Sequence, residues 1–238
     1  MKQMKFLGLA LVAIFATGIL FSSCDNNDDE VNKTPHVKIN FNTVTTPMTV
    51  TDRLKSAMEA KELAFTSGFI TLREIQFEVE TDNDSIEVEF ELEINTQIDF
   101  ATGETNPDIS FVEIPAGTYN EFEVEIELQD EGDSPSMVLD GAYIDANGTS
   151  HPVRFEFNSG ETFQIEQEGI IVFTTNTSAL THITIDPTAW FAEVTNEMLT
   201  NADKIDGVIV ISETQNTDIF EIAADGLDFS SEVEIEID

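Results

Sequence analysis

The sequence predicts a mainly β fold, an antiparallel β-sandwich of two sheets with a few short helices. Apolar and acidic residues alternate over long stretches such as 86–100 and 121–128, which is the period of half-buried strands. Strands buried on both faces, as in parallel sheets, would instead be apolar throughout. About ten such segments are separated by turn signals, and two packed sheets would bury their apolar faces.

The expected strands show this alternation in full or in part. In chain order they are 37–41, 69–79, 86–100, 109–114, 121–128, 137–144, 153–157, 170–173, 181–185 and 233–237. Turn signals agree with these boundaries at Pro115-Ala116-Gly117 and at Asn158-Ser159-Gly160. Asn147-Gly148 stands between two alternating runs, and this dipeptide is the strongest short signal for a β-hairpin.

The segment 69–79 changes its alternation part of the way along. Ile70 and Leu72 fall on even positions, whereas Ile75 and Phe77 fall on odd positions. One extra residue in the strand would keep all four side chains on the same face. The sequence therefore predicts a β-bulge near Arg73-Glu74.

Helical signals are few. Residues 51–63 are rich in helix formers, and 195–202 and 217–224 have the composition of short helices. None of the three is long enough to be stable unless it packs on a sheet. Trp190 stands just before the second of these segments, and we expect it to lie in the core.

The N-terminus predicts export and lipidation. A basic start at 1–5 and an apolar run at 6–20 have the lengths of a secretory signal, which is shorter than a membrane span. The run ends at Phe21-Ser22-Ser23-Cys24, which resembles a bacterial lipobox except that Phe21 replaces the usual aliphatic residue. We expect residues 1–23 to be removed, Cys24 to be lipidated, 24–34 to be a flexible acidic tether, and 35–238 to be the folded domain.

Three further segments resemble a group of Bacteroidetes surface lipoproteins of a domain-of-unknown-function family. They are Phe65-Thr66-Ser67-Gly68 with Leu72-Arg73-Glu74-Ile75, then Ile114-Pro115-Ala116-Gly117-Thr118-Tyr119, and the segment from Ile185-Asp186-Pro187 to Trp190-Phe191. The resemblance implies a transthyretin-like or immunoglobulin-like sandwich. It also implies an outer-membrane lipoprotein exposed at the cell surface, since the acidic run after Cys24 resembles an export signal of these bacteria. It supplies no catalytic residues.

Composition excludes some functions. With 10 Lys plus Arg against 47 Asp plus Glu, the formal charge is -37, so the chain lacks the basic patch that nucleic acids require. The three His residues stand at no metal-ligand spacing, and no nucleophile elbow, P-loop or dinucleotide fingerprint occurs. The sequence therefore predicts no enzyme activity.

His182 alternates with Ile183 and Ile185, so we expect it on the polar face of a strand.

Acidic residues carry the remaining expectations. Rows of Glu along strands repel one another, and they indicate either a solvated face or a surface that binds cations or a basic partner. Calcium, which prefers six to eight converging oxygens, is expected at turns rich in Asp. The residues considered for it are Asp82, Asp84, Asp130, Asp133, Asp203 and Asp206. Asp84-Ser85-Ile86 resembles an O-glycosylation acceptor of these bacteria, with Ser85 as the site.

Three functions remain open on the sequence, and the one that the missing catalytic motifs favour least is a hydrolase, which would show turnover on a glycan or peptide panel. The first is a lipid-anchored, non-catalytic envelope protein that binds a partner, a glycan or a cation. The second is a structural subunit resembling the anchored fimbrial proteins of the same bacteria, matured by cleavage after an Arg. Arg53 is the Arg that lies between Cys24 and the first strongly alternating strands.

Overall fold

The computed structural model describes residues 35–50, 61–81, 88–109, 111–132, 134–174, 178–227 and 230–232. These residues belong to one compact unit, Asn32–Asp238. The strands are β1 (His36–Thr43), β2 (Met48–Val50), β3 (Lys61–Glu80), β4 (Val88–Asp99), β5 (Thr105–Asn106), β6 (Phe111–Glu113), β7 (Gly117–Leu128), β8 (Met137–Ile144), β9 (Ser150–Phe157), β10 (Thr162–Phe173), β11 (Ser178–Ile185), β12 (Lys204–Ile205), β13 (Val208–Ile211) and β14 (Ser230–Glu232). The helices are α1 (Pro187–Trp190), α2 (Asn196–Asn201) and α3 (Thr217–Asp225).

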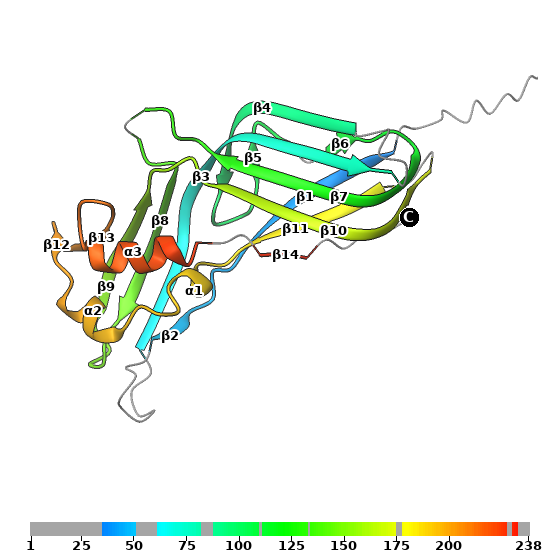
Figure 1. The fold of residues 1–238 in the computed structure, drawn as a ribbon. Helices are drawn as coiled ribbons and strands as arrows, with labels where there is room; N and C mark the ends of the chain where they lie inside the picture. Colours follow the sequence, from blue (N-terminus) through cyan, green and yellow to red (C-terminus); the bar gives the residue numbers. More distant parts are fainter. Residues whose placement is uncertain are drawn as a thin grey trace, which may run out of the picture. The chain divides into compact units, whose positions relative to one another are not determined.

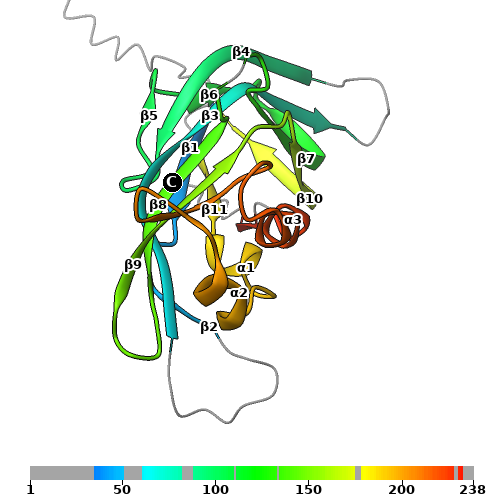
Figure 2. The same ribbon diagram turned by 90° about the vertical axis from the view of Figure 1, so that its left-hand side faces the viewer.

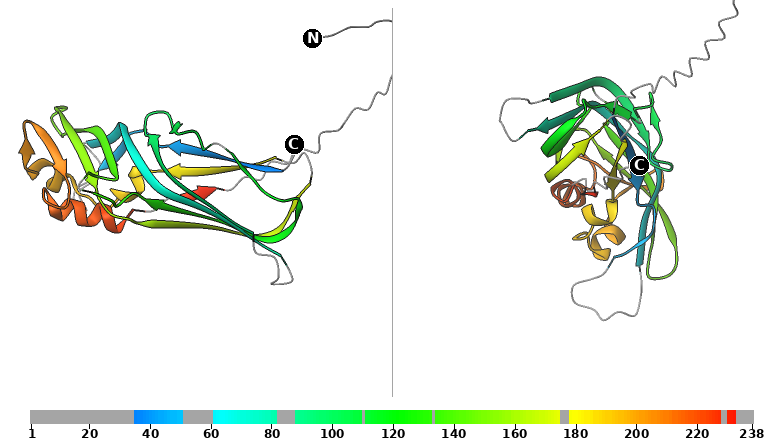
Figure 3. Two further views of the ribbon diagram at one scale, coloured as in Figure 1. Left: turned by 90° about the horizontal axis from the view of Figure 1, so that it is seen from above. Right: turned by 90° about the vertical axis from the view of Figure 1, so that its right-hand side faces the viewer.

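The strands form a large sheet built around β3 and a small sheet. The large sheet has the order β10-β7-β3-β8-β9-β13-β12, and β2 and β4 also pair with β3 (Figure 1). The long strand β3 has different neighbours along its length, because its first half pairs with β8 and its second half with β7. The small sheet has the order β14-β11-β1-β6, and Figure 3 shows β1, β11 and β14 side by side.

The change of neighbours along β3 coincides with the predicted bulge. The register of β3 with both β4 and β7 shifts between Leu72 and Glu74. Relative to β7 the extra residue is Arg73, whereas relative to β4 the extra residue is on β4. Leu72 on one side of the shift and Ile75 on the other are both buried, at 0% and 2% exposure. The bulge therefore keeps one apolar face along the whole strand, and the prediction from the change of alternation is confirmed.

Both sheets are mixed, so the expectation of purely antiparallel pairing is wrong in two places. β1 pairs with β11 in parallel over eight residues, and β9 pairs with β13 in parallel. All other pairs between the named strands are antiparallel in the part of the chain that the structure describes. Alternation reports which face of a strand is buried, and it does not report the direction of the neighbouring strand.

The hairpin and two of the helices agree with the sequence. The β8–β9 turn contains Asn147-Gly148, with Gly148 at φ 76°, and the backbone amide of Asp145 donates to the carbonyl of Thr149 at 3.0 Å. α2 and α3 lie within one residue of the expected ranges. The hydroxyl of Thr195 caps α2 by accepting from the backbone amide of Met198.

The first expected helix differs from the structure. Residues 61–63 belong to β3, while 51–60 lie outside the described residues. Leu63 is fully buried and stands between Met48 of β2 and Tyr143 of β8 in the sheet register. Pairing on both sides and burial outweigh the helix propensity of this segment.

One apolar core joins the two sheets and the helices. It contains residues of the small sheet, such as Phe41 and Ile183, together with those of the large sheet. Figure 2 shows α1, α2 and α3 gathered on one side of β8 and β9. There Phe191 lies 5.1 Å from Phe65 between ring centroids, and Trp190 is 1% exposed. The expectation that Trp190 is a core residue is confirmed.

Candidate functional site

The most unusual surface of the protein is formed by the outward-facing residues of β3 and β7. Their inward residues, such as Phe77 and Val124, are fully buried, and the alternating residues between them are mostly half-buried. The outward residues are Glu74, Gln76, Glu78 and Glu80 of β3 with Glu121, Glu123, Glu125 and Glu127 of β7. We call these eight residues the glutamate face. It is the solvent side of the part of the sheet beyond the bulge.

The register of the two strands places like charges directly opposite each other. Glu78 pairs with Glu123, Glu80 with Glu121, and Glu74 with Glu127. Directly opposed residues in antiparallel strands have Cβ atoms about 4.5–5.5 Å apart, and like charges there are destabilising. The sequence suggested this arrangement only if two Glu-rich strands became neighbours, and the structure makes them neighbours.

The strands on either side continue the acidic rows. In the register, Glu89 of β4 stands beside Glu78, and Glu166 of β10 stands beside Glu123. Four consecutive strands therefore place Glu in one row, Glu89–Glu78–Glu123–Glu166. Glu168 is likewise aligned with Glu121. Glu residues therefore recur along each strand and also line up across the four neighbouring strands.

A cation meets the glutamate face at its bulge end. Arg73, the extra residue of the bulge, lies 3.1 Å from a carboxylate oxygen of Glu127 and 3.6 Å from one of Asp130. Asp130 was expected as a calcium ligand, and here its carboxylate is beside a guanidinium. The bulge turns Arg73 toward the loop after β7, so the positive charge is placed at the edge of the face.

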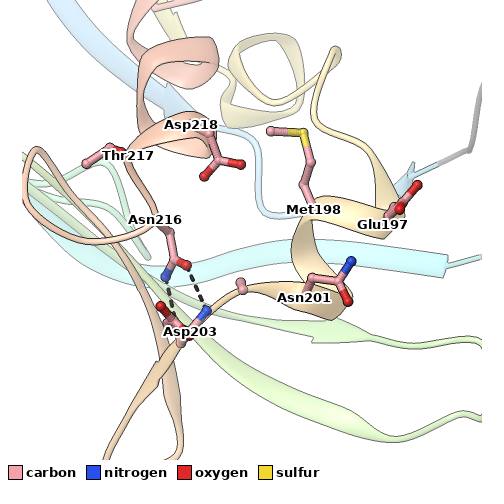
Figure 4. A pocket seen from close by; sticks show the side chains of 8 residues that line it. Glu197, Met198, Asn201, Asp203, Asn216, Thr217 and Asp218 are labelled. Carbon is pink, nitrogen blue, oxygen red and sulfur yellow. Dashed lines mark hydrogen bonds between the residues drawn. The ribbon is translucent and has the colours of Figure 1, made fainter.

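A second acidic feature lies between α2, α3 and the residue before β12. It is a cavity of about 500 Å³, shown in Figure 4, which we call the acidic groove. Its lining residues are Glu197, Met198, Asn201, Ala202, Asp203, Asn216, Thr217 and Asp218. The groove thus brings Asp203, an expected site residue, beside two carboxylates of α2 and α3.

Asn216 organises one wall of the acidic groove. It is in the left-handed region at φ 50°, and its side chain does not cap α3. Instead its Oδ1 accepts from the backbone amide of Asp203 at 2.8 Å, and its Nδ2 donates to the carbonyl of Asp203 at 3.0 Å (Figure 4). Two reciprocal bonds therefore fix the chain at Asp203 to the start of α3.

The expected calcium ligands are not brought together where the structure describes them. Among the described residues, no three side chains of His, Cys, Asp or Glu are placed to share a metal ion. Asp203 and Asp206 are both exposed, and Asp206 is at φ 52° in the turn between β12 and β13. The other predicted positions, Cys24, Arg53, Asp82, Asp84, Ser85 and Asp133, lie outside the described residues.

The three histidines are not equivalent. His182 is partly exposed between the buried residues Thr181 and Ile183, as predicted, and its Nδ1 accepts from the side-chain amides of Asn40 at 3.3 Å and Asn42 at 3.2 Å. Both Asn residues are on β1, which runs parallel to β11. This amide pair fixes the ring from the neighbouring strand.

His151 belongs to a charged cluster that no motif in the sequence indicates. Its Nε2 lies 3.0 Å from Oδ2 of Asp145, and its Nδ1 lies 2.9 Å from Nζ of Lys204. The hydrogen bond from His151 lowers the pKa of Asp145 to about 2, with help from the backbone amide of Thr149. Asp145 and His151 flank the Asn-Gly turn, so their contact could have been predicted, whereas Lys204 is brought in by the parallel β9–β13 pairing.

Comparison with protein-family models, curated proteins and solved structures found no match for this chain. Within the described ranges, no helix is both long and apolar enough to cross a bilayer.

Proposed function

We propose that the protein is a non-catalytic lipoprotein of the cell envelope, anchored through Cys24 in the outer membrane and exposed at the surface, whose glutamate face binds a basic partner protein. In this proposal residues 24–34 are the tether, and 35–238 form a β-sandwich of the transthyretin-like kind. The single observation that carries the binding role is the alignment of Glu in rows across four neighbouring strands.

The rows support a binding role because they oppose stability. Like charges directly opposed in antiparallel strands are destabilising, whereas opposite charges in the same positions contribute about 0.2–1 kcal/mol. Alternating charges would keep the surface equally polar without that cost. Surfaces that lower stability are commonly those that serve function. A partner with distributed positive charge would replace repulsion by attraction over the whole face.

The other ligands considered for the protein fit the described residues less well. A glycan site requires exposed aromatic rings for stacking, yet Trp190, Tyr119 and Tyr143 are 1%, 3% and 0% exposed. A calcium site requires converging oxygens, and a regular sheet holds its side chains apart. A basic protein surface can bind to a flat acidic face, without a pocket and without oxygen atoms that converge on one point.

Binding of decalysine, a simple basic probe, tests this proposal. The test variant replaces Glu78, Glu80, Glu121 and Glu123 by Gln, which neutralises two opposed pairs. The matched control replaces four exposed residues elsewhere, Glu113, Glu161, Glu213 and Glu221, by Gln. By calorimetry at low salt, we expect the test variant to lose at least tenfold in affinity and the control to keep nearly all of it. Equal losses would mean that decalysine senses net charge alone, and would refute the proposal.

A second candidate function is the fimbrial-type subunit, and the place of β1 favours it. β1 lies inside the small sheet between β11 and β6, and its residues Val37 and Phe41 are buried. It precedes Arg53 in the chain, so cleavage there would separate β1 from the strands that flank it. A vacated strand position is the kind of groove that accepts a strand from another subunit.

Treatment with an Arg-specific protease followed by electron microscopy tests this second candidate. Polymers that form from wild-type protein and not from an Arg53→Gln variant would support it. Persistent monomers after complete cleavage at Arg53 would refute it.

A further inference from the structure

The cluster at the end of the β8–β9 hairpin joins three segments through one imidazole ring. Asp145 is in the turn, His151 is on β9, and Lys204 is on β12. The ring also stacks on Tyr143 of β8, with centroids 6.0 Å apart and an interplanar angle of 25°. The side chain of His151 is 23% exposed, and its two ring nitrogens are hydrogen-bonded to Asp145 and Lys204.

The hydrogen bonds assign the protons on this ring. A lysine ammonium has only donors, so Nδ1 of His151 must accept from Lys204 and therefore carries no proton. Nε2 then carries the proton and donates it to Asp145. Both bonds exist together only while the imidazole is neutral.

The neighbouring contacts do not depend on the charge of the ring. The hydroxyl of Tyr143 donates to Oδ1 of Asn196 and lies 3.1 Å from the hydroxyl of Thr200, which ties β8 to α2. Asp203 is held by Asn216 at the start of α3. None of these contacts uses the imidazole of His151. Protonation of the ring would therefore act on the contact between His151 and Lys204.

The charged groups around the ring are few. The turn presents Asp145, which stays ionised above pH 4 because its pKa is about 2. β12 presents Lys204, flanked by Asp203 and Asp206, while β13 has no charged residue. The charged residue of α2, Glu197, lines the acidic groove. An imidazolium would keep its bond to Asp145 and would face the ammonium of Lys204 with a second positive charge.

We propose that protonation of His151 releases Lys204 and frees β12 from the end of the β8–β9 hairpin, so that this contact is a pH-sensitive latch beside the acidic groove. The latch is closed while the imidazole is neutral and open once it is protonated, and histidine is the side chain whose charge ordinarily changes between pH 5 and 8. It is independent of the glutamate face, which lies on β3 and β7.

His182 is a natural control within the same molecule. Its Nδ1 also accepts two hydrogen bonds, but the donors are the amides of Asn40 and Asn42. An amide side chain can turn over and present its oxygen to a protonated ring nitrogen, whereas a lysine cannot. Protonation of His182 is therefore expected to leave β1 in place.

Hydrogen exchange of the full-length protein at pH 7.5 and pH 5.0, corrected for intrinsic exchange, tests the latch. We expect protection of the amides in 204–207 to fall about tenfold at pH 5.0, as the loss of one charge-assisted hydrogen bond predicts. Protection in 196–200 and in β1 should not change. The Lys204→Gln variant keeps a side-chain partner for either form of the ring, so its 204–207 protection should be equal at both pH values.

Three results would overturn the proposal. The first is equal protection of 204–207 in the wild type at both pH values, while histidine NMR signals show that His151 has become protonated. The second is a similar loss in 196–200, because that would be general acid destabilisation and not release of β12. The third is a wild-type loss that persists unchanged in Lys204→Gln, which would contradict the role of the lysine.

Discussion

Two antiparallel strand pairs of the large sheet, β8–β9 and β3–β7, differ in the charges that they place opposite each other. In β8–β9, Asp140 stands opposite Arg154, and the guanidinium donates to both carboxylate oxygens at 2.7 and 2.9 Å. This bond raises the pKa of Arg154. In β3–β7, Glu78 stands opposite Glu123. The register thus places opposite charges directly across the strands in the first pair and like charges directly across the strands in the second.

The two regions share their inward packing, and the largest expected effects test this. Phe77 lies under the glutamate face and Phe155 beside Arg154, and both are fully buried. We expect Phe77→Ala and Phe155→Ala each to lower the free energy of unfolding by about 3–5 kcal/mol. Urea unfolding measures this. A loss below about 1 kcal/mol for either variant would show that its region lies outside the common core.

Converting the complementary pair into a like-charged pair is the next test. We expect Arg154→Glu to destabilise the protein by about 1 kcal/mol, because it removes the bond to Asp140 and adds a repulsive pair beside Glu156. Arg154→Gln, which removes the charge alone, serves as the control and should have a smaller effect, since the pair is about 40% exposed. Equal stability of both variants would mean that cross-strand repulsion is negligible on this sheet.

The next prediction concerns how the free energy of unfolding depends on pH through Asp145, whose carboxylate accepts hydrogen bonds from His151 and from the backbone amide of Thr149. The pKa of Asp145 in the folded protein is about 2, below its ordinary value of 3.8. Its contribution to stability is therefore present above pH 4 and is lost as the pH falls through 2. We expect wild type to be more stable than Asp145→Asn at pH 7, and this difference to shrink steadily as the pH is lowered from 4 to 2. A difference that stays the same from pH 4 to pH 2 would assign the effect to packing.

The smallest expected effect concerns calcium. If repulsion on the glutamate face is relieved by screening alone, calcium chloride and sodium chloride at matched ionic strength should raise the melting temperature equally. An additional rise with calcium that a chelator reverses would instead establish a folded-state calcium site. Mutagenesis would then start at the Asp82, Asp130 and Asp203 loops.

The sequence predicts those features that depend on one strand or one turn. Alternation identified the buried faces of β7 and β9, the change of alternation located the bulge at Arg73, and Asn147-Gly148 located the hairpin. Strand order and direction depend on contacts between distant segments, so the parallel partners of β1 and β9 were not predicted. The same reason explains why the glutamate rows were conditional on strand pairing and why Lys204 was not connected with His151.

The free energy of unfolding at low salt tests the central claim most directly. The claim is that the glutamate face opposes stability and is kept for binding. Urea unfolding should show that the variant with Gln at positions 78, 80, 121 and 123 is more stable than wild type by about 0.5–2 kcal/mol, since two opposed pairs are relieved. The control with Gln at 113, 161, 213 and 221 should gain less. Equal or lower stability of the first variant would contradict the account.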